Sequence, residues 1–156
     1  MKILGIDPGY ERLGIAVIEK EKGKEKLLYS TCFKTPKTDS FYKRLLALGK
    51  KVEEVIQKYD VDTLSIETLF LNTNQKTVMR VSEVRGAIIL EAAKANLDIY
   101  EYTPLQIKIA LTGYGRGTKD QVAFMVQRLL NLKDDKKLDD EYDAIAAALT
   151  CSACVK

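Results

Sequence analysis

The residues of this chain that could do chemistry together are carboxylates that flank apolar segments. Asp7 closes the apolar run that opens the chain, and Glu67 closes a second one. Asp140 and Asp143 stand three residues apart ahead of an alanine-rich segment, so a helix there would place both on one face. An isolated carboxylate at the end of a buried strand is costly, so each one needs a cation or a hydrogen-bonding turn.

Oxygen ligands that converge without histidine or cysteine suit a hard cation such as Mg²⁺ or Mn²⁺. Four acids can hold two such ions about 4 Å apart, one activating water and the other stabilising the leaving oxygen of a phosphodiester. The chain has no histidine. This excludes a Ser-His-Asp or Cys-His nucleophile and a His-ligated metal, so acid–base chemistry must use carboxylates, Lys, Tyr or metal-bound water.

Each acid also has a simpler interpretation. Asp7 precedes a Pro-Gly pair and is suited to capping that turn through its side chain. Acidic residues near Asp140 are favoured at a helix N-terminus by the helix dipole alone. Asp139 lies four residues before Asp143 and is a rival ligand to Asp140. From spacing alone, these interpretations stay open beside the metal site.

Composition predicts a globular domain but does not identify its partner. Its 156 residues are 46% hydrophobic, which predicts one domain, residues 1–156, with a substantial core. The net charge of +3 permits nucleic-acid binding without requiring it. Charged residues interrupt the first twenty positions, so we expect no signal peptide and no membrane association. Three cysteines are an odd number, which is typical of reduced thiols and predicts a cytoplasmic protein.

The hydrophobic pattern predicts an α/β fold with a mixed five-stranded sheet, an antiparallel meander plus parallel strands, flanked by helices. Charged residues 19–25 are expected to form a loop within the meander, and Gly86 is expected to permit a close approach of backbone. A strand–helix–strand crossover is right-handed and parallel, which would bring Asp7 and Glu67 to one edge of the sheet. The expected strands are 2–7, 13–18, 26–33, 61–66 and 97–102. The expected helices begin after Ser40, near Asn74, after Thr103, after Thr118 and near Asp139. Thr103 and Thr118 each begin a capping box, and the last helix is expected to reach about Cys151.

A series of short motifs, taken together and in this order, resembles the RuvC family of crossover junction endodeoxyribonucleases. The resemblance covers nearly the whole chain, and no single motif would carry it. The motifs are Gly5-Ile6-Asp7-Pro8-Gly9, Ile66-Glu67-Thr68-Leu69-Phe70, Val84-Arg85-Gly86-Ala87, Thr103-Pro104, Thr112-Gly113-x-Gly115-Arg116, Lys119-x-Gln121-Val122 and Asp140-x-x-Asp143-Ala144.

The resemblance implies a ribonuclease H-like fold and a homodimer that cuts Holliday junctions symmetrically in DNA recombination and repair. It implies Mg²⁺ as the cofactor, with Mn²⁺ able to substitute and two ions in each active site. It also implies the RuvA and RuvB branch-migration proteins as partners. Some family members carry a histidine in the last acidic cluster, whereas this chain has none and must activate water through metal. By motif, the metal-binding catalytic acids would be Asp7, Glu67, Asp140 and Asp143.

The resemblance also assigns residues to the DNA. Phe70 would stack on bases at the crossover, although a lone aromatic after a strand is more often part of a core. Lys108 and Lys119 would lie near the scissile phosphate. Arg116 belongs to a glycine-rich segment that suits phosphate contacts and equally suits a flexible connector. This segment lacks the residues of a Walker loop or a dinucleotide fingerprint, so we expect no nucleotide cofactor.

Three rival functions remain at this point. A sugar-kinase or chaperone-type ATPase also begins with an apolar strand, Asp and Gly, but it is a duplicated two-domain protein and needs more than 156 residues. A junction-binding module without catalysis would not need all four acids. A related ribonuclease H-like enzyme that acts on RNA shares the same acids, and substrate cleavage would distinguish it.

Overall fold

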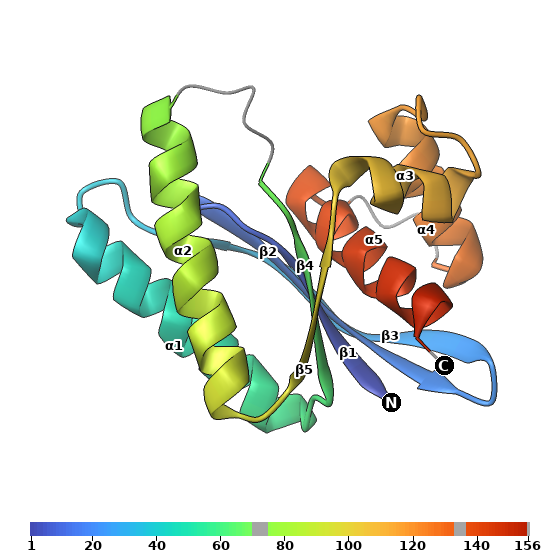
Figure 1. The fold of residues 1–156 in the computed structure, drawn as a ribbon, viewed down its shortest axis with the longest axis horizontal. Helices are drawn as coiled ribbons and strands as arrows, with labels where there is room; N and C mark the ends of the chain where they lie inside the picture. Colours follow the sequence, from blue (N-terminus) through green and yellow to red (C-terminus); the bar gives the residue numbers. More distant parts are fainter. Residues whose placement is uncertain (70–74, 133–136, 156) are drawn as a thin grey trace.

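The sheet at the centre of the molecule is mixed and has five strands in the order β3-β2-β1-β4-β5. The computed structural model describes residues 1–69, 75–132 and 137–155. Helices cover both faces of the sheet, with α1 and α2 on one side and α3, α4 and α5 on the other (Figure 1). The elements are β1 Lys2–Asp7, β2 Arg12–Glu21, β3 Lys24–Lys34, α1 Phe41–Tyr59, β4 Thr63–Glu67, α2 Gln75–Lys94, β5 Asp98–Tyr102, α3 Pro104–Thr112, α4 Lys119–Leu129 and α5 Asp139–Cys154.

β1 is the middle strand and is buried on both faces, as its continuous apolar run predicts. It pairs antiparallel with β2 and parallel with β4. Alternation along the strand feeds two cores: Ile3 packs with the α5 side, while Leu4 and Ile6 pack with the α1 and α2 side. The mixed sheet, the meander and the parallel β1–β4 pair are therefore confirmed.

Two sequence predictions about local structure need correction. The charged segment 19–25 is mostly strand, because β2 continues to Glu21 and β3 begins at Lys24. Only Lys22 and Gly23 form the turn, and both have positive φ, the geometry that a two-residue hairpin requires. Two of the charged side chains have partners at the C-terminal end of α5, since Lys20 Nζ donates to the carbonyl of Val155 at 3.0 Å and Glu25 Oε1 accepts from Ser152 Oγ at 2.7 Å.

The buried side of α2 is narrower than its sequence pattern indicated. Val84, Ile88 and Ala92 are buried, whereas Ala95, which continues the same helical spacing, follows the last residue of α2 and is exposed. Gly86 is also exposed, and in the described residues no atom lies within 4 Å of the position that a Cβ would take there. No close approach within the described part of the chain therefore accounts for this glycine.

Helix boundaries follow the capping signals. Ser40 caps α1, and Thr103 and Thr118 form the two predicted capping boxes that begin α3 and α4. α5 begins at Asp139 as expected but runs to Cys154, three residues further than predicted. Among the described helices, none combines the length and hydrophobicity that crossing a bilayer demands.

Candidate active site

Two of the predicted acids end adjacent parallel strands. Ile6 of β1 is paired with Ile66 of β4, so Asp7 and Glu67 emerge side by side at the same edge of the sheet. The crossover through α1 produces this arrangement, because a parallel pair must align its carboxyl ends. The structure therefore brings Asp7 and Glu67 together as the sequence predicted.

α5 delivers the other two acids by lying very close to the sheet. Gly14 is paired with Asp7 in the β1–β2 ladder, and a Cβ on Gly14 would overlap the carbonyl oxygen of Asp140. A Cβ on Gly5 would likewise overlap the carbonyl of Ala144 one turn later. Only glycine permits this distance between helix and strand. The two glycines therefore fix the first turn of α5 against the end of β1.

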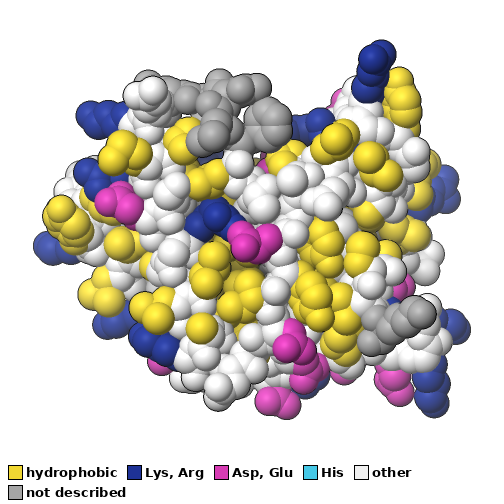
Figure 2. Space-filling model, viewed as in Figure 1, with side chains coloured by type: hydrophobic (Ala, Val, Ile, Leu, Met, Phe, Trp, Pro, Cys, Tyr) yellow, Lys and Arg dark blue, Asp and Glu magenta, His cyan; other side chains and the backbone are white. Residues whose placement is uncertain are grey.

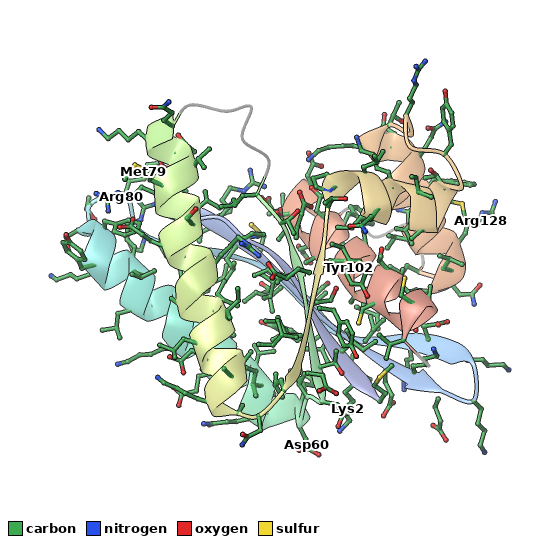
Figure 3. All side chains as sticks on the ribbon, in the orientation of Figure 1. Lys2, Asp60, Met79, Arg80, Tyr102 and Arg128 are labelled. Carbon is green, nitrogen blue, oxygen red and sulfur yellow. The ribbon has the colours of Figure 1, made fainter. Side chains whose placement is uncertain are left out.

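A buried hydrogen bond anchors the same helix to the neighbouring strand. Ser65 of β4 donates from Oγ to the carbonyl of Ala147 at 2.7 Å, and both residues are fully buried. A buried hydroxyl without a partner would cost about 1–3 kcal/mol, so this bond also sets the position of α5 along β4. At the far end of β5, Tyr102 points toward α5 and contacts Cys151 (Figure 3).

The electrostatics of the four acids show mutual repulsion. Burial, followed by the charges of Asp143, Glu67 and Asp140, raises the pKa of Asp7 from 3.8 to about 7. Burial, followed by Asp143, raises the pKa of Glu67 from 4.5 to about 7, against the opposing effect of Lys119 and Lys108. The site therefore has more carboxylates than it can keep ionised on its own, which is the donor set that a hard cation fits.

Cations of the chain itself neutralise the two helix acids. Lys119 at the start of α4 donates from Nζ to Asp143 Oδ2 at 2.9 Å, and this hydrogen bond raises the pKa of Lys119. Arg12 at the start of β2 donates to Asp140 Oδ2. In the described residues, no three His, Cys, Asp or Glu side chains already stand as a metal site. A metal ion held by Asp140 or Asp143 would compete with these two cations for the carboxylate oxygens.

Asp140 and its rival Asp139 differ in the groups that they face. The charge of Asp140 contributes to the raised pKa of Asp7, and the backbone of Asp140 lies against Gly14 beside Asp7. Asp139 is exposed, and its charge acts on Lys119 instead. Its position suits stabilisation of the helix N-terminus.

Two arginines at the site were not assigned to it from sequence. Arg12 reaches Asp140 across 128 positions of the chain, and no local pattern indicates such a pair. The sequence alone leaves Arg85 open as a solvated helix charge or as a DNA or dimer contact. Its Nε donates to the carbonyl of Glu67 at 3.0 Å, and its guanidinium pairs with Glu101. Arg85 thus holds the end of β4 that presents Glu67.

The predicted DNA-contacting residues separate into three groups. Lys108 and Lys119 both act on the charge of Glu67, so α3 and α4 bring two cations to the acidic edge. Arg116 lies exposed in the connection between these helices. Phe70 lies outside the described residues.

Comparison with known proteins by sequence and by overall structure identifies one family. The family model described as crossover junction endodeoxyribonuclease RuvC matches residues 3–151. Crossover junction endodeoxyribonuclease RuvC of Alkaliphilus oremlandii is 44% identical over 96% of this chain and 91% of its own, and the Campylobacter jejuni protein of that name is 43% identical over 98% and 96%. The structure of Thermus thermophilus RuvC in complex with Holliday junction substrate has a TM-score of 0.93, with 32% identity over 99% of this chain and 94% of that one.

The raised pKa values predict how stability depends on pH when no divalent metal is present. The folded state binds protons on Asp7 and Glu67 more tightly than the unfolded chain does, because both pKa values are raised to about 7. Their contribution to stability is therefore full below about pH 4 and is lost as the pH rises through about 7. We expect the unfolding temperature in EDTA to fall across this range, and the fall to be smaller for Asp7→Asn. Parallel curves for the wild type and Asp7→Asn would contradict the electrostatics described above.

Proposed function

Because the chain belongs to the RuvC family of crossover junction endodeoxyribonucleases, we propose that it resolves Holliday junctions by hydrolysing phosphodiesters at the edge formed by Asp7, Glu67, Asp140 and Asp143. The observation that carries the assignment of the site is the convergence of β1, β4 and α5, which places four acids where two of them have pKa values raised to about 7. The whole chain, acting as one nuclease domain, supplies this edge.

The family depends on a divalent metal, and we propose Mg²⁺, replaceable by Mn²⁺, with two ions held by the four carboxylates. When bound, such ions lower the pKa of water and stabilise charge on the oxygens of a phosphodiester. The protein's part is to provide ionised carboxylates of fixed position. Arg85 and Ser65 contribute by holding β4 and α5 in place.

Lys119 is suited to exchange one anion for another. Its ammonium group pairs with Asp143 and is 70% exposed, so it can move to a DNA phosphate once Asp143 turns toward a cation. Lys108 on α3 lies beside the same edge. We propose that Lys108, Arg116 and Lys119 contact phosphates of the four-way junction and that Phe70 stacks on unpaired bases at the crossover, a contact worth about 1–3 kcal/mol per base.

Symmetric cutting of a two-fold junction calls for two sites related by a two-fold axis, which a homodimer supplies. We propose that α1 and α2 form this interface. A groove of about 570 Å³ runs between them, and Tyr42 and Leu46 at its rim are exposed. Leu90 is exposed on α2, where Gly86 leaves open space for a second backbone. Figure 2 shows hydrophobic side chains interrupting the polar surface over these helices.

Beyond the dimer, we propose that the protein works in the cytoplasm beside RuvA and RuvB. The net charge of +3 and the cations around the acidic edge favour association with DNA, a large anion.

Removal of one carboxylate charge tests the catalytic assignment. Asp7→Asn, Glu67→Gln, Asp140→Asn and Asp143→Asn keep the shape of each side chain but weaken binding of a divalent cation. We expect each to abolish Mg²⁺-dependent cleavage of a synthetic four-way junction, while junction binding in EDTA is kept or tightened because less negative charge faces the phosphates.

Asp139→Asn is the matched control for that series. We expect it to keep cleavage and to lose about 1 kcal/mol or less of stability from the helix N-terminus. Loss of cleavage in Asp139→Asn with normal cleavage in Asp140→Asn would place the ligand one residue earlier. Normal cleavage by all five variants would overturn the metal-nuclease assignment, and cleavage of RNA–DNA hybrid in preference to the junction would overturn the substrate.

The interface is tested by placing a charge within it. Leu90→Asp should dissociate the dimer, because an unpaired carboxylate buried between two copies is costly. Leu129→Asp on α4, a similarly exposed leucine outside the proposed interface, is the control and should leave the dimer intact. Light scattering measures the mass of each variant at micromolar concentration. A monomeric wild type that cuts junctions at full rate would contradict the interface and the symmetric mechanism.

A further inference from the structure

A polar cavity, separate from the groove between α1 and α2, lies beside the edge of the sheet that carries Asp7. It has a volume of about 360 Å³ and is lined by Tyr10, Phe41, Arg44, Lys76, Thr77 and Arg80. These residues come from the turn after β1 and from the first two turns of α1 and of α2. Tyr10 is three positions beyond Asp7, so the cavity opens from the same connection that presents the first catalytic acid.

Arg44 gives this cavity a buried cation with an unused donor. Its side chain is 9% exposed, its Nε donates to Thr35 Oγ1 at 2.8 Å, and Thr35 donates to the carbonyl of Tyr10 at 2.7 Å. Its Nη2 lies 4.0 Å from Glu11 Oε1 and makes no hydrogen bond to any described residue. A buried donor on a charged group is costly when unpaired, so an acceptor that reaches Nη2 would be favoured.

The charges around the cavity favour an anionic acceptor. Its lining contains Arg44, Lys76 and Arg80 and no acidic residue. The neighbouring acids are already engaged at the periphery, since Glu83 pairs with Arg80 at 3.0 Å and the half-exposed Glu11 lies 3.9 Å from Lys37. The lining therefore carries three cations, against the two acids, Glu11 and Glu83, that pair with them.

The two aromatic rings hold the guanidinium groups in place. The Arg80 guanidinium lies 4.1 Å from the centre of the Phe41 ring, and that of Arg44 lies 5.1 Å from the centre of the Tyr10 ring. Arg80 points from α2 toward the beginning of α1 (Figure 3). Stacked guanidinium groups lose less freedom on binding and present a planar fork that matches phosphate oxygens.

We propose that this cavity binds a backbone phosphate of the junction, separate from the phosphodiester that is cut, so that Arg44, Lys76 and Arg80 fix the DNA strand relative to Asp7. The inference rests on the proposed function, because DNA is the phosphate source that this edge of the sheet meets. Successive phosphates recur along each strand, so a duplex that reaches the acids presents further phosphates to the adjoining surface. A phosphate oxygen on Arg44 Nη2 would complete the hydrogen bonds of that buried side chain.

The salt dependence of junction binding tests this site. Arg44→Gln, Lys76→Gln and Arg80→Gln each remove one charge at the cavity, and Lys58→Gln removes one charge from the exposed far end of α1. The probe is a fluorescein-labelled synthetic four-way junction in EDTA, titrated by anisotropy at several NaCl concentrations. We expect each cavity variant to reduce the slope of log affinity against log salt by about one, and Lys58→Gln to leave it unchanged.

Arg44→Gln also removes a buried contact, so thermal unfolding is measured for every variant. Lys76→Gln and Arg80→Gln decide the result if Arg44→Gln does not fold.

In a second experiment, single methylphosphonates replace phosphates along the junction strands. One position should weaken binding of the wild type while leaving binding of Arg80→Gln unaffected. If Lys76→Gln and Arg80→Gln are folded and both show the salt slope of the wild type, this phosphate site alone is overturned. If the wild type neither prefers nor cuts the junction, the proposed function is overturned.

Discussion

Repulsion among carboxylates at one edge of the sheet is the constraint on which the rest of the structure depends. Asp7 and Glu67 lie side by side because parallel strands end together, and α5 adds Asp140 and Asp143 to the same volume. Without a compensating cation, burial and mutual repulsion raise the pKa values of Asp7 and Glu67 to about 7. The chain offsets this by directing Arg12 and Lys119 at the helix acids. This arrangement suits a family of divalent-metal-dependent nucleases, because a metal cation can replace Arg12 and Lys119 as the partner of the carboxylates.

The fold maintains this unfavourable cluster through contacts that have little freedom to relax. Gly14 and Gly5 let α5 lie against β1 and β2 at a distance that no other residue permits. Ser65 fixes the helix along β4, and Arg85 holds the carbonyl of Glu67 from the opposite layer. These contacts connect the acids to a sheet whose central strands are fully buried, so the packing of the fold holds the repelling carboxylates together.

Much of the site could be predicted because its strongest signals are local. An apolar strand that ends in Asp7, a second that ends in Glu67, and capping boxes at Thr103 and Thr118 are each readable within a few residues. Which of Asp139 and Asp140 lies closer to Asp7 was not predictable from sequence, because both belong to the first turn of a helix and only the packing of α5 on Gly14 distinguishes them. The match of residues 3–151 to one nuclease family favours that family over the duplicated ATPases.

What the sequence could not reveal involves partners far apart along the chain. Arg12 meets Asp140, and Arg85 meets Glu67 and Glu101, only after the sheet and helices have assembled. The length of the buried side of α2 was not predictable either, since Ala95 fits the helical period but follows the last residue of the helix and is exposed. Hydrophobic periodicity identifies a helix more readily than it identifies how far the neighbouring layer extends.

Proton release on metal binding tests the central claim most directly. Calorimetric titration of Mn²⁺ into the metal-free protein at pH 7, repeated in buffers of different ionisation enthalpy, measures how many protons leave for each ion bound. Since Asp7 and Glu67 have pKa values of about 7, each is about half protonated at that pH, and the account predicts release of about one proton in total. Binding that releases no protons, with an affinity that does not change between about pH 6 and pH 8, would contradict it.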